Sequence, residues 1–141
     1  MITDVANHFI KELTAKTTKS EIEWKPLCEL YSDTSGFPDF LNQSWEMLNC
    51  NEFKMVQREN SFFFFHNQGI ISLMRIENYS GRDSSHYASY SIILQIRKNY
   101  PPQSLCEGLF QDELEILYMA VLDYINRDIS LPDDLYKFLN F

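Results

Sequence analysis

The chain has 141 residues, of which 45% are hydrophobic and 15% aromatic, and 20 Asp and Glu residues against 12 Lys and Arg give it a net charge of −8. The hydrophobic content excludes an intrinsically disordered chain, and the length fits a single domain over residues 1–141. The negative charge argues against direct binding to nucleic acid or to an anionic membrane, because both need a positive field. It permits a basic protein as the partner.

The cysteines and the first residues point to the compartment. Cys28, Cys50 and Cys106 are widely spaced and form no CxxC pair, so neither a zinc site nor a redox motif is indicated. Free thiols fit a reducing environment. Residues 1–4 do not start a basic region followed by an apolar run, and no apolar stretch reaches the length of a membrane span. We therefore expect a cytoplasmic protein with no membrane segment, metal or cofactor.

The first part of the chain predicts two helices around a short strand. Apolar residues at helical spacing predict a helix over residues 3–16. Residues 21–25 alternate between polar and apolar side chains, and Pro26 places the resulting strand at an edge of a sheet. Residues 37–48 fit a short helix because four apolar side chains share one side. They are Phe37, Leu41, Trp45 and Leu48.

The middle of the chain predicts an antiparallel meander. The expected strands are residues 53–57, 61–66, 70–77 and 87–97. The second and third are joined by a tight turn over residues 67–69, in which Gly69 is expected to take a positive φ. In the fourth strand the alternation is interrupted by Ile93. Pro101 and Pro102 are expected to end the sheet.

The last part of the chain predicts helices. Residues 110–127 give the strongest helical pattern, with Asp112 and Glu113 near the positive end of the helix dipole. Ser130 then resembles the cap of a final helix whose apolar side contains Leu135, Phe138 and Leu139. Strands in the middle and helices at both ends predict an α+β fold. We expect an antiparallel sheet of about four strands with the N-terminal and C-terminal helices packed on one face.

Four consecutive phenylalanines, Phe62–Phe65, are the most unusual feature. Neighbouring residues of a strand face opposite sides, so Phe62 and Phe64 take one face and Phe63 and Phe65 the other. One face can pack beneath the helices. The other is either buried by the 37–48 segment or forms an exposed apolar patch for a partner, for a second copy of the chain or for a small ligand.

The outer side of the 110–127 helix is the second candidate surface. Ile116 and Met119 lie among acidic residues there, and methionine suits adaptable binding surfaces. One interpretation is that they are scattered surface hydrophobic side chains, which are common on proteins. The functional alternative is an acidic face that binds a basic, partly apolar partner. The predicted partner-binding residues are Phe62, Phe63, Phe64, Phe65, Glu115, Ile116, Met119 and Asp123.

Sequence patterns that would indicate catalysis, metal binding or nucleic-acid binding are weak. The three histidines, His8, His66 and His86, show no HxxxH or HExxH spacing, so no metal ligands are predicted. Asp83, Ser84 and His86 share one loop, but residues this close rarely adopt the geometry of a catalytic triad, and no GxSxG motif is present. No catalytic residues are predicted. Aromatic strands near Arg75, Arg97 and Lys98 would suit base stacking, which the acid excess opposes.

Short motifs resemble a group of small uncharacterised proteins of bacteria and their phages. The motifs are residues 9–13, then Thr17-Thr18, then Glu21-Ile22-Glu23-Trp24, and later Gln111-Asp112-Glu113-Leu114. They are similar to a first helix, a "KT" turn, an "I-x-W" strand and a helix after a meander. Lys19-Ser20 stand where a glycine usually follows the turn. The resemblance implies an accessory protein of a mobile element or its host, a class that includes stoichiometric inhibitors.

The sequence therefore predicts a non-catalytic protein-interaction module. In its sharpest form the hypothesis is an acidic inhibitor of a host defence protein that covers a basic surface, and a homodimer is one variant of it. Two alternatives stay open. The first is a small-molecule-binding domain that uses the aromatic face of the sheet, and the second is an enzyme of unknown class.

Overall fold

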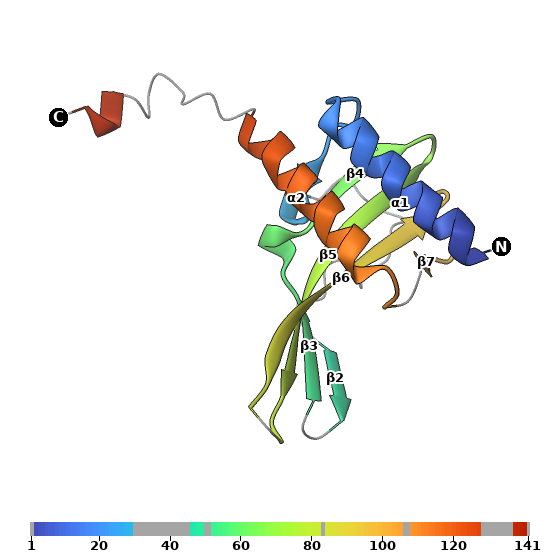
Figure 1. Ribbon diagram of the computed structural model, residues 1–141, viewed down its shortest axis with the longest axis vertical. Coiled ribbons are helices and arrows are strands. Elements are labelled where there is room, and N and C mark those ends of the chain that lie inside the picture. The colour runs from blue at the N-terminus through green and yellow to red at the C-terminus, as the bar shows by residue number, and fades with distance from the viewer. Residues whose placement is uncertain are drawn as a thin grey trace.

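The computed structural model describes residues 2–29, 46–49, 52–82, 84–105, 108–127 and 137–140. The α+β fold is confirmed: every strand pairing is antiparallel, and two helices cover one face of the sheet (Figure 1). In chain order the elements are α1 (Ile2–Thr18), β1 (Lys25–Pro26), the 3-10 turn η1 (Leu27–Glu29), β2 (Glu46–Asn49), β3 (Glu52–Val56), the 3-10 turn η3 (Arg58–Asn60), β4 (Phe62–His66), β5 (Gly69–Ser80), β6 (His86–Gln95), β7 (Gln103–Leu105) and α2 (Gln111–Arg127).

Strand β5 is the centre of the sheet. Strand β6 pairs with it along one side, from Ile70↔Gln95 to Tyr79↔His86. On the other side β4 pairs with the first part of β5 and β3 with the second part, with η3 between them. Strand β2 lies beyond β3, β1 beyond β4 and β7 beyond β6. The sheet has seven strands in the described residues: these three short edge strands add to the four of the predicted meander, and of the three only β1 overlaps a strand that was also predicted, that of residues 21–25.

One end of the sheet extends beyond the helices. It consists of β2, β3, residues 76–80 of β5 and residues 86–90 of β6, and we call it the arm. In Figure 1 the arm projects as a twisted ribbon below the part of the sheet that α1 and α2 cover. The fold therefore combines a helix-covered body with a strand extension.

The main core lies between the helices and the body of the sheet. Helix α1 directs Ile10 and Leu13 onto the sheet, and α2 directs Leu114, Leu117 and Val121, at the i, i+3 and i+7 spacing of one helix face. The two helices pack against each other as well as on the sheet. The strands contribute Phe62, Phe64, Ile71, Leu73 and Ile92.

A smaller core lies on the opposite face of the sheet. Leu27, Phe63, Ile70 and Met74 are buried there, and Ile93 packs partly against them. The second core explains why an apolar residue interrupts the polar side of the β6 pattern. The predicted alternation of the phenylalanine run is confirmed, because Phe62 and Phe64 belong to the main core while Phe63 belongs to this one.

The strand predicted over residues 21–25 is shorter than expected, because β1 consists of Lys25–Pro26 alone. The predicted burial alternation is correct: Ile22 and Trp24 are buried. Residues 21–24 belong to no strand, and Trp24 contacts α1. Its Nε1 donates to Oγ1 of buried Thr17 at 2.9 Å, and its ring meets Phe64 edge-on with centroids 4.7 Å apart.

Three other boundary predictions need correction. The helix expected over residues 37–48 falls mostly outside the described residues, but residues 46–49 form β2, so its last turn was wrong. The sheet does not end at Pro101 and Pro102, because β7 follows them. Residues 137–139 are helical, as expected of the last helix, but Phe138 and Leu139 are exposed; Leu135 lies outside the described residues.

The prediction for Gly69 was also wrong, although the hairpin itself is present. Asn67 takes the left-handed conformation at φ 55°, and Gly69 is not among the described residues with positive φ. Gly69 is instead required by close packing. A Cβ at this position would lie 2.1 Å from the carbonyl oxygen of Gln95 and 2.4 Å from that of Ile96. The glycine therefore allows β5 and β6 to approach each other.

Candidate functional site

Most of the phenylalanine run is inside the molecule. Phe62, Phe63 and Phe64 are buried, whereas Phe65 is 53% exposed. The ring of Phe65 meets that of Phe63 edge-on, with centroids 5.4 Å apart. Of the four aromatic side chains, only Phe65 is therefore accessible to a partner without rearrangement of the strand.

The outer face of α2 remains open to solvent. Ile116 is 61% exposed and Met119 is 58% exposed, although Leu117 and Val121 on the opposite side of the same helix are fully buried. The helical spacing places Met119 between Ile116 and Asp123, because residues three and four apart are neighbours on a helix surface. The exposed pair is thus a consequence of the same helical periodicity that builds the core.

Acidic side chains surround this apolar pair. Asp112, Glu115 and Asp123 are exposed on the same face of α2, and Glu113 is in the first turn. No described residue forms an ion pair with Asp112, Glu113 or Glu115. Excess carboxylates around an apolar centre make this face suitable for a cationic surface. We call Asp112, Glu115, Ile116, Met119 and Asp123 the α2 face.

A groove lies in the body of the protein, between α1 and the β4–β5 hairpin. Its volume is about 450 Å³, and a smaller hollow of about 270 Å³ adjoins it, with Phe9, His66 and Ile71 lining both. Phe64 and Phe65 also line the larger groove. The rim is charged, and it consists of Glu12, Lys16, Glu21 and Glu23. Aromatic lining with a polar rim is typical of small-ligand sites.

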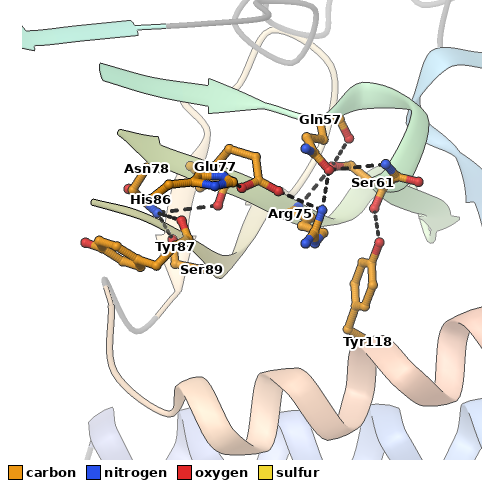
Figure 2. Close-up of polar contacts among 11 residues, drawn as sticks. Gln57, Ser61, Arg75, Glu77, Asn78, His86, Tyr87, Ser89 and Tyr118 are labelled. Carbon is orange, nitrogen blue, oxygen red and sulfur yellow. Dashed lines mark hydrogen bonds and ion pairs between the residues drawn. The ribbon is translucent and has the colours of Figure 1, made fainter. Parts of the chain in front are cut away.

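A polar network joins the arm to the body (Figure 2). Glu77 is buried in β5, and its carboxylate pairs with Nη1 of Arg75 at 2.7 Å and with Nε2 of His86. Arg75 also donates to Oε1 of Gln57. The three ionisable groups lie on the helix-facing side of the sheet because alternate residues of β5 share a face. The network compensates the burial of the carboxylate and fixes the start of the arm.

Hydrogen bonds between side-chain hydroxyls and backbone groups stabilise the β3–β4 junction next to this network. Ser61 Oγ donates to the carbonyl of Gln57 at 2.7 Å and accepts from the backbone N–H of Arg75 at 2.9 Å. The hydroxyl of Tyr118 in α2 donates to the carbonyl of Asn60 at 2.6 Å, as Figure 2 shows. Burial raises the pKa of Tyr118 to about 12, so this donor keeps its proton at neutral pH. One helix is thereby connected to the origin of the arm.

The network does not form a catalytic constellation. His86 contacts an acid, Glu77, and stacks on Tyr79 with centroids 4.6 Å apart, but no serine, threonine or cysteine of the described residues bonds to its ring. Ser84 takes a positive φ in the turn before it, and Asp83 lies outside the described residues. Within the described part of the chain, no group of three or more His, Cys, Asp and Glu could hold a metal ion.

The cationic side chains considered for base stacking are dispersed. Arg75 is held by Glu77 and Gln57, and the guanidinium of Arg97 lies 4.5 Å above the ring of Tyr100. Lys98 is exposed in the turn after β6. These three residues form no continuous basic surface with the phenylalanine strand, whose rings are mostly buried.

The side-chain amide of Gln111 occupies the edge of β6. The N–H of Tyr90 donates to Gln111 Oε1 at 2.8 Å, and Gln111 Nε2 donates to the carbonyl of Tyr90 at 2.9 Å. These two bonds are the ones that a neighbouring strand would make. The first residue of α2 therefore attaches the helix, and with it the α2 face, to the sheet edge at the base of the arm.

Comparison of the chain with protein-family models, with curated proteins and with solved structures gives no match. No helix in the described residues is long and apolar enough to cross a membrane. The functional assignment therefore depends on the surface and the contacts described above.

Sequence reasoning missed the residues at the base of the arm. Arg75 and Glu77 are the only charged residues of β5, two positions apart on one strand face, and this spacing was a usable signal of a cross-strand network. Gln111 gave no such signal, because a glutamine in the first turn of a helix is usually solvated. Its role depends on which strand edge lies beside that turn, and this is a property of the tertiary fold.

Proposed function

We propose that the protein is a non-catalytic interaction module that binds a basic protein partner through the α2 face. The observation that supports the proposal most is the exposed pair Ile116 and Met119 among carboxylates, of which Glu115 and Asp112 have no cationic partner in the described residues. An apolar centre within a charged rim is the usual anatomy of a protein interface. Charge complementarity would accelerate association with a cationic surface and select it against acidic proteins.

The proposed activity is stoichiometric inhibition in the cytoplasm, in which the acidic face occupies a basic functional surface of a host protein. A chain from a bacterium or a mobile element fits this role, as the sequence resemblance implies. The net charge of −8 supports a partner of opposite charge. It disfavours a homodimer through the same face, because two α2 faces would place like charges opposite each other.

The experiment is capture from native cells followed by measurement of the dissociation constant for the recovered protein. Reversal of Glu115 and Asp123 to lysine should weaken binding by about tenfold or more, because like charges would then face the partner. The matched control reverses Glu29 and Glu59, two exposed glutamates on the 3-10 turns, and so makes the same change in net charge. Equal affinity of the α2 variant and this control for the partner would exclude the α2 face as the binding surface.

The groove between α1 and the hairpin favours one alternative, a small-molecule-binding domain. Its volume of about 450 Å³ and its aromatic lining by Phe9, Phe64 and Phe65 fit a compact apolar ligand. Native mass spectrometry of gently purified protein tests this alternative. A co-purifying ligand that is lost on Phe65→Ser would support it, whereas a ligand-free spectrum for the wild-type protein would contradict it.

A further inference from the structure

Within the described residues, the outer edge of β6 is open along the arm. On that side β6 pairs with β7 only at residues 92–94. The side-chain amide of Gln111 forms hydrogen bonds with the N–H and the C=O of Tyr90. Backbone direction alternates along an antiparallel strand, so Ala88 and His86 direct their N–H and C=O groups to the same side as Tyr90. No strand of the described residues pairs with residues 86–89 there. A row of unpaired backbone groups is a template for another strand.

Three features favour an added strand at this position. The edge already donates one strand-like hydrogen bond to Gln111 and accepts one from it, so its geometry suits a partner backbone. The other edge of β6 is paired with β5 over ten register pairs, which fixes the position of its backbone. The side chain of Ala88 is small, and Tyr87 is 63% exposed on the opposite face of the sheet. An incoming strand would therefore find side-chain contacts on both faces.

The charges near the edge select the partner. Gln111 is followed directly by Asp112 and Glu113, so two carboxylates of the first turn of α2 are one and two residues from the side chain that bonds to Tyr90. An added strand would place alternate side chains on the helix side of the sheet, near these carboxylates. Lysine or arginine at alternate positions would suit that environment. A second copy of this chain would instead bring together two chains of net charge −8.

We infer that residues 86–89 of β6 bind an extended basic segment of the partner by strand addition, next to the α2 face. The inference rests on the proposed function, because it assigns the binding mode of the same basic partner. Strand addition supplies affinity through main-chain hydrogen bonds and specificity through alternate side chains. The partner would contact the edge of β6 and the α2 face at the same time, since Gln111 connects the first turn of α2 to Tyr90 on the same strand.

The test uses the full-length chain, labelled with ¹⁵N, and a short peptide that alternates lysine with valine and has blocked ends. We expect saturable shifts of the His86 and Ala88 amide signals and a slowing of Ala88 amide exchange by about fivefold or more, the effect of roughly one added hydrogen bond. A peptide of the same sequence with methylated backbone nitrogens has the same charge but lacks the main-chain donors. It should bind more weakly at this edge.

The matched variants are Ala88→Pro and Ala88→Thr. Proline removes the outward N–H but not a ladder bond to β5, so Ala88→Pro should weaken peptide binding by about fivefold or more, whereas Ala88→Thr retains the donor and should bind like the wild type. Circular dichroism checks that both fold. If Ala88→Pro does not fold, the amide shifts and the amide exchange of the wild-type protein test strand addition without the variant.

The outcomes separate the two proposals. Shifts confined to Ile116 and Met119, with unchanged binding by Ala88→Pro, would overturn strand addition and leave the α2 face as the binding surface. Absence of binding by the peptide and by any captured basic protein would overturn both. A concentration-dependent dimer of the free protein that Ala88→Pro abolishes would show that the edge pairs with a second copy, and this result would also overturn the inference.

Discussion

Gln111 and Tyr90 are joined by two hydrogen bonds, 2.8 and 2.9 Å long, in which the side chain of a helical residue replaces a neighbouring strand. The pair attaches the start of α2 to β6 at the point where the arm leaves the body. Through it, the exposed acidic face of a helix and the open edge of a strand become parts of one rigid surface. The proposed binding mode depends on this connection.

Replacement of Gln111 by alanine tests the connection. Both hydrogen bonds would be lost, and the free energy of unfolding should fall by about 1 kcal/mol, because water replaces the partner at an accessible edge. Amide exchange of Tyr90 should accelerate. Urea denaturation and hydrogen exchange measure the two effects. Asn126→Ala, at an exposed position near the other end of α2, is the control and should leave Tyr90 protected; equal exchange in both variants would contradict the assigned role.

Glu77 is expected to contribute most to the stability of the arm. Glu77→Ala would leave Arg75 without its carboxylate in a partly buried site, and we expect a loss of about 2 kcal/mol or more in the free energy of unfolding. Glu77→Gln keeps a hydrogen-bond acceptor and should cost less. Denaturation of both variants, with Glu59→Gln as an exposed control, makes the measurement. An unchanged midpoint for Glu77→Ala would show that the network contributes no stability.

The stability of the protein should depend on Tyr118 at alkaline pH. Burial raises the pKa of Tyr118 from 10.0 to about 12, with Arg75 opposing the shift. The folded state therefore favours the neutral phenol. The contribution of Tyr118 to the free energy of unfolding is complete below the pKa of the unfolded chain, and it is lost as the pH rises from 10.0 to about 12.

Tyr118→Phe isolates that contribution. At neutral pH the variant should lose about 1 kcal/mol with the bond to Asn60. Above pH 10 the difference from the wild type should shrink, because ionisation of the buried phenol destabilises the folded wild type, whereas the phenylalanine of the variant cannot ionise. Tyr90→Phe is a second probe: its ring lies beside Tyr118 with centroids 4.8 Å apart, and its phenol contributes to the raised pKa of Tyr118, so this variant should narrow the pH range over which stability is lost. A constant difference between Tyr118→Phe and the wild type from pH 7 to about 11 would contradict the assigned shift.

Periodic patterns predicted the body of the fold well. The helix expected over residues 110–127 is α2 to within one residue, and the alternation of Phe62–Phe65 is correct. These features follow from local geometry, because a core face repeats every two residues in a strand and about every 3.6 in a helix. The exposed positions of Ile116 and Met119 follow from the same helical pattern.

The remaining features depend on contacts between distant segments. Residues 46–49 form a strand because β3 offers them an edge, which a helical spacing of apolar residues cannot reveal. The glycine at position 69 is needed for the approach of Gln95, a residue far along the chain, and not for a turn. Burial of Phe63 likewise depends on a second core that includes Leu27. Such pairings are set by tertiary packing, which overrides local preference.

The affinity of the captured partner as a function of salt tests the proposed acidic interface most directly. The dissociation constant should rise steadily between about 50 and 500 mM salt, because counterions screen the attraction between the carboxylates of the α2 face and a basic surface. Reversal of Glu115 and Asp123 to lysine should abolish most of this dependence. An affinity that is independent of salt, or an equal dependence in the wild type and the reversed variant, would contradict the account.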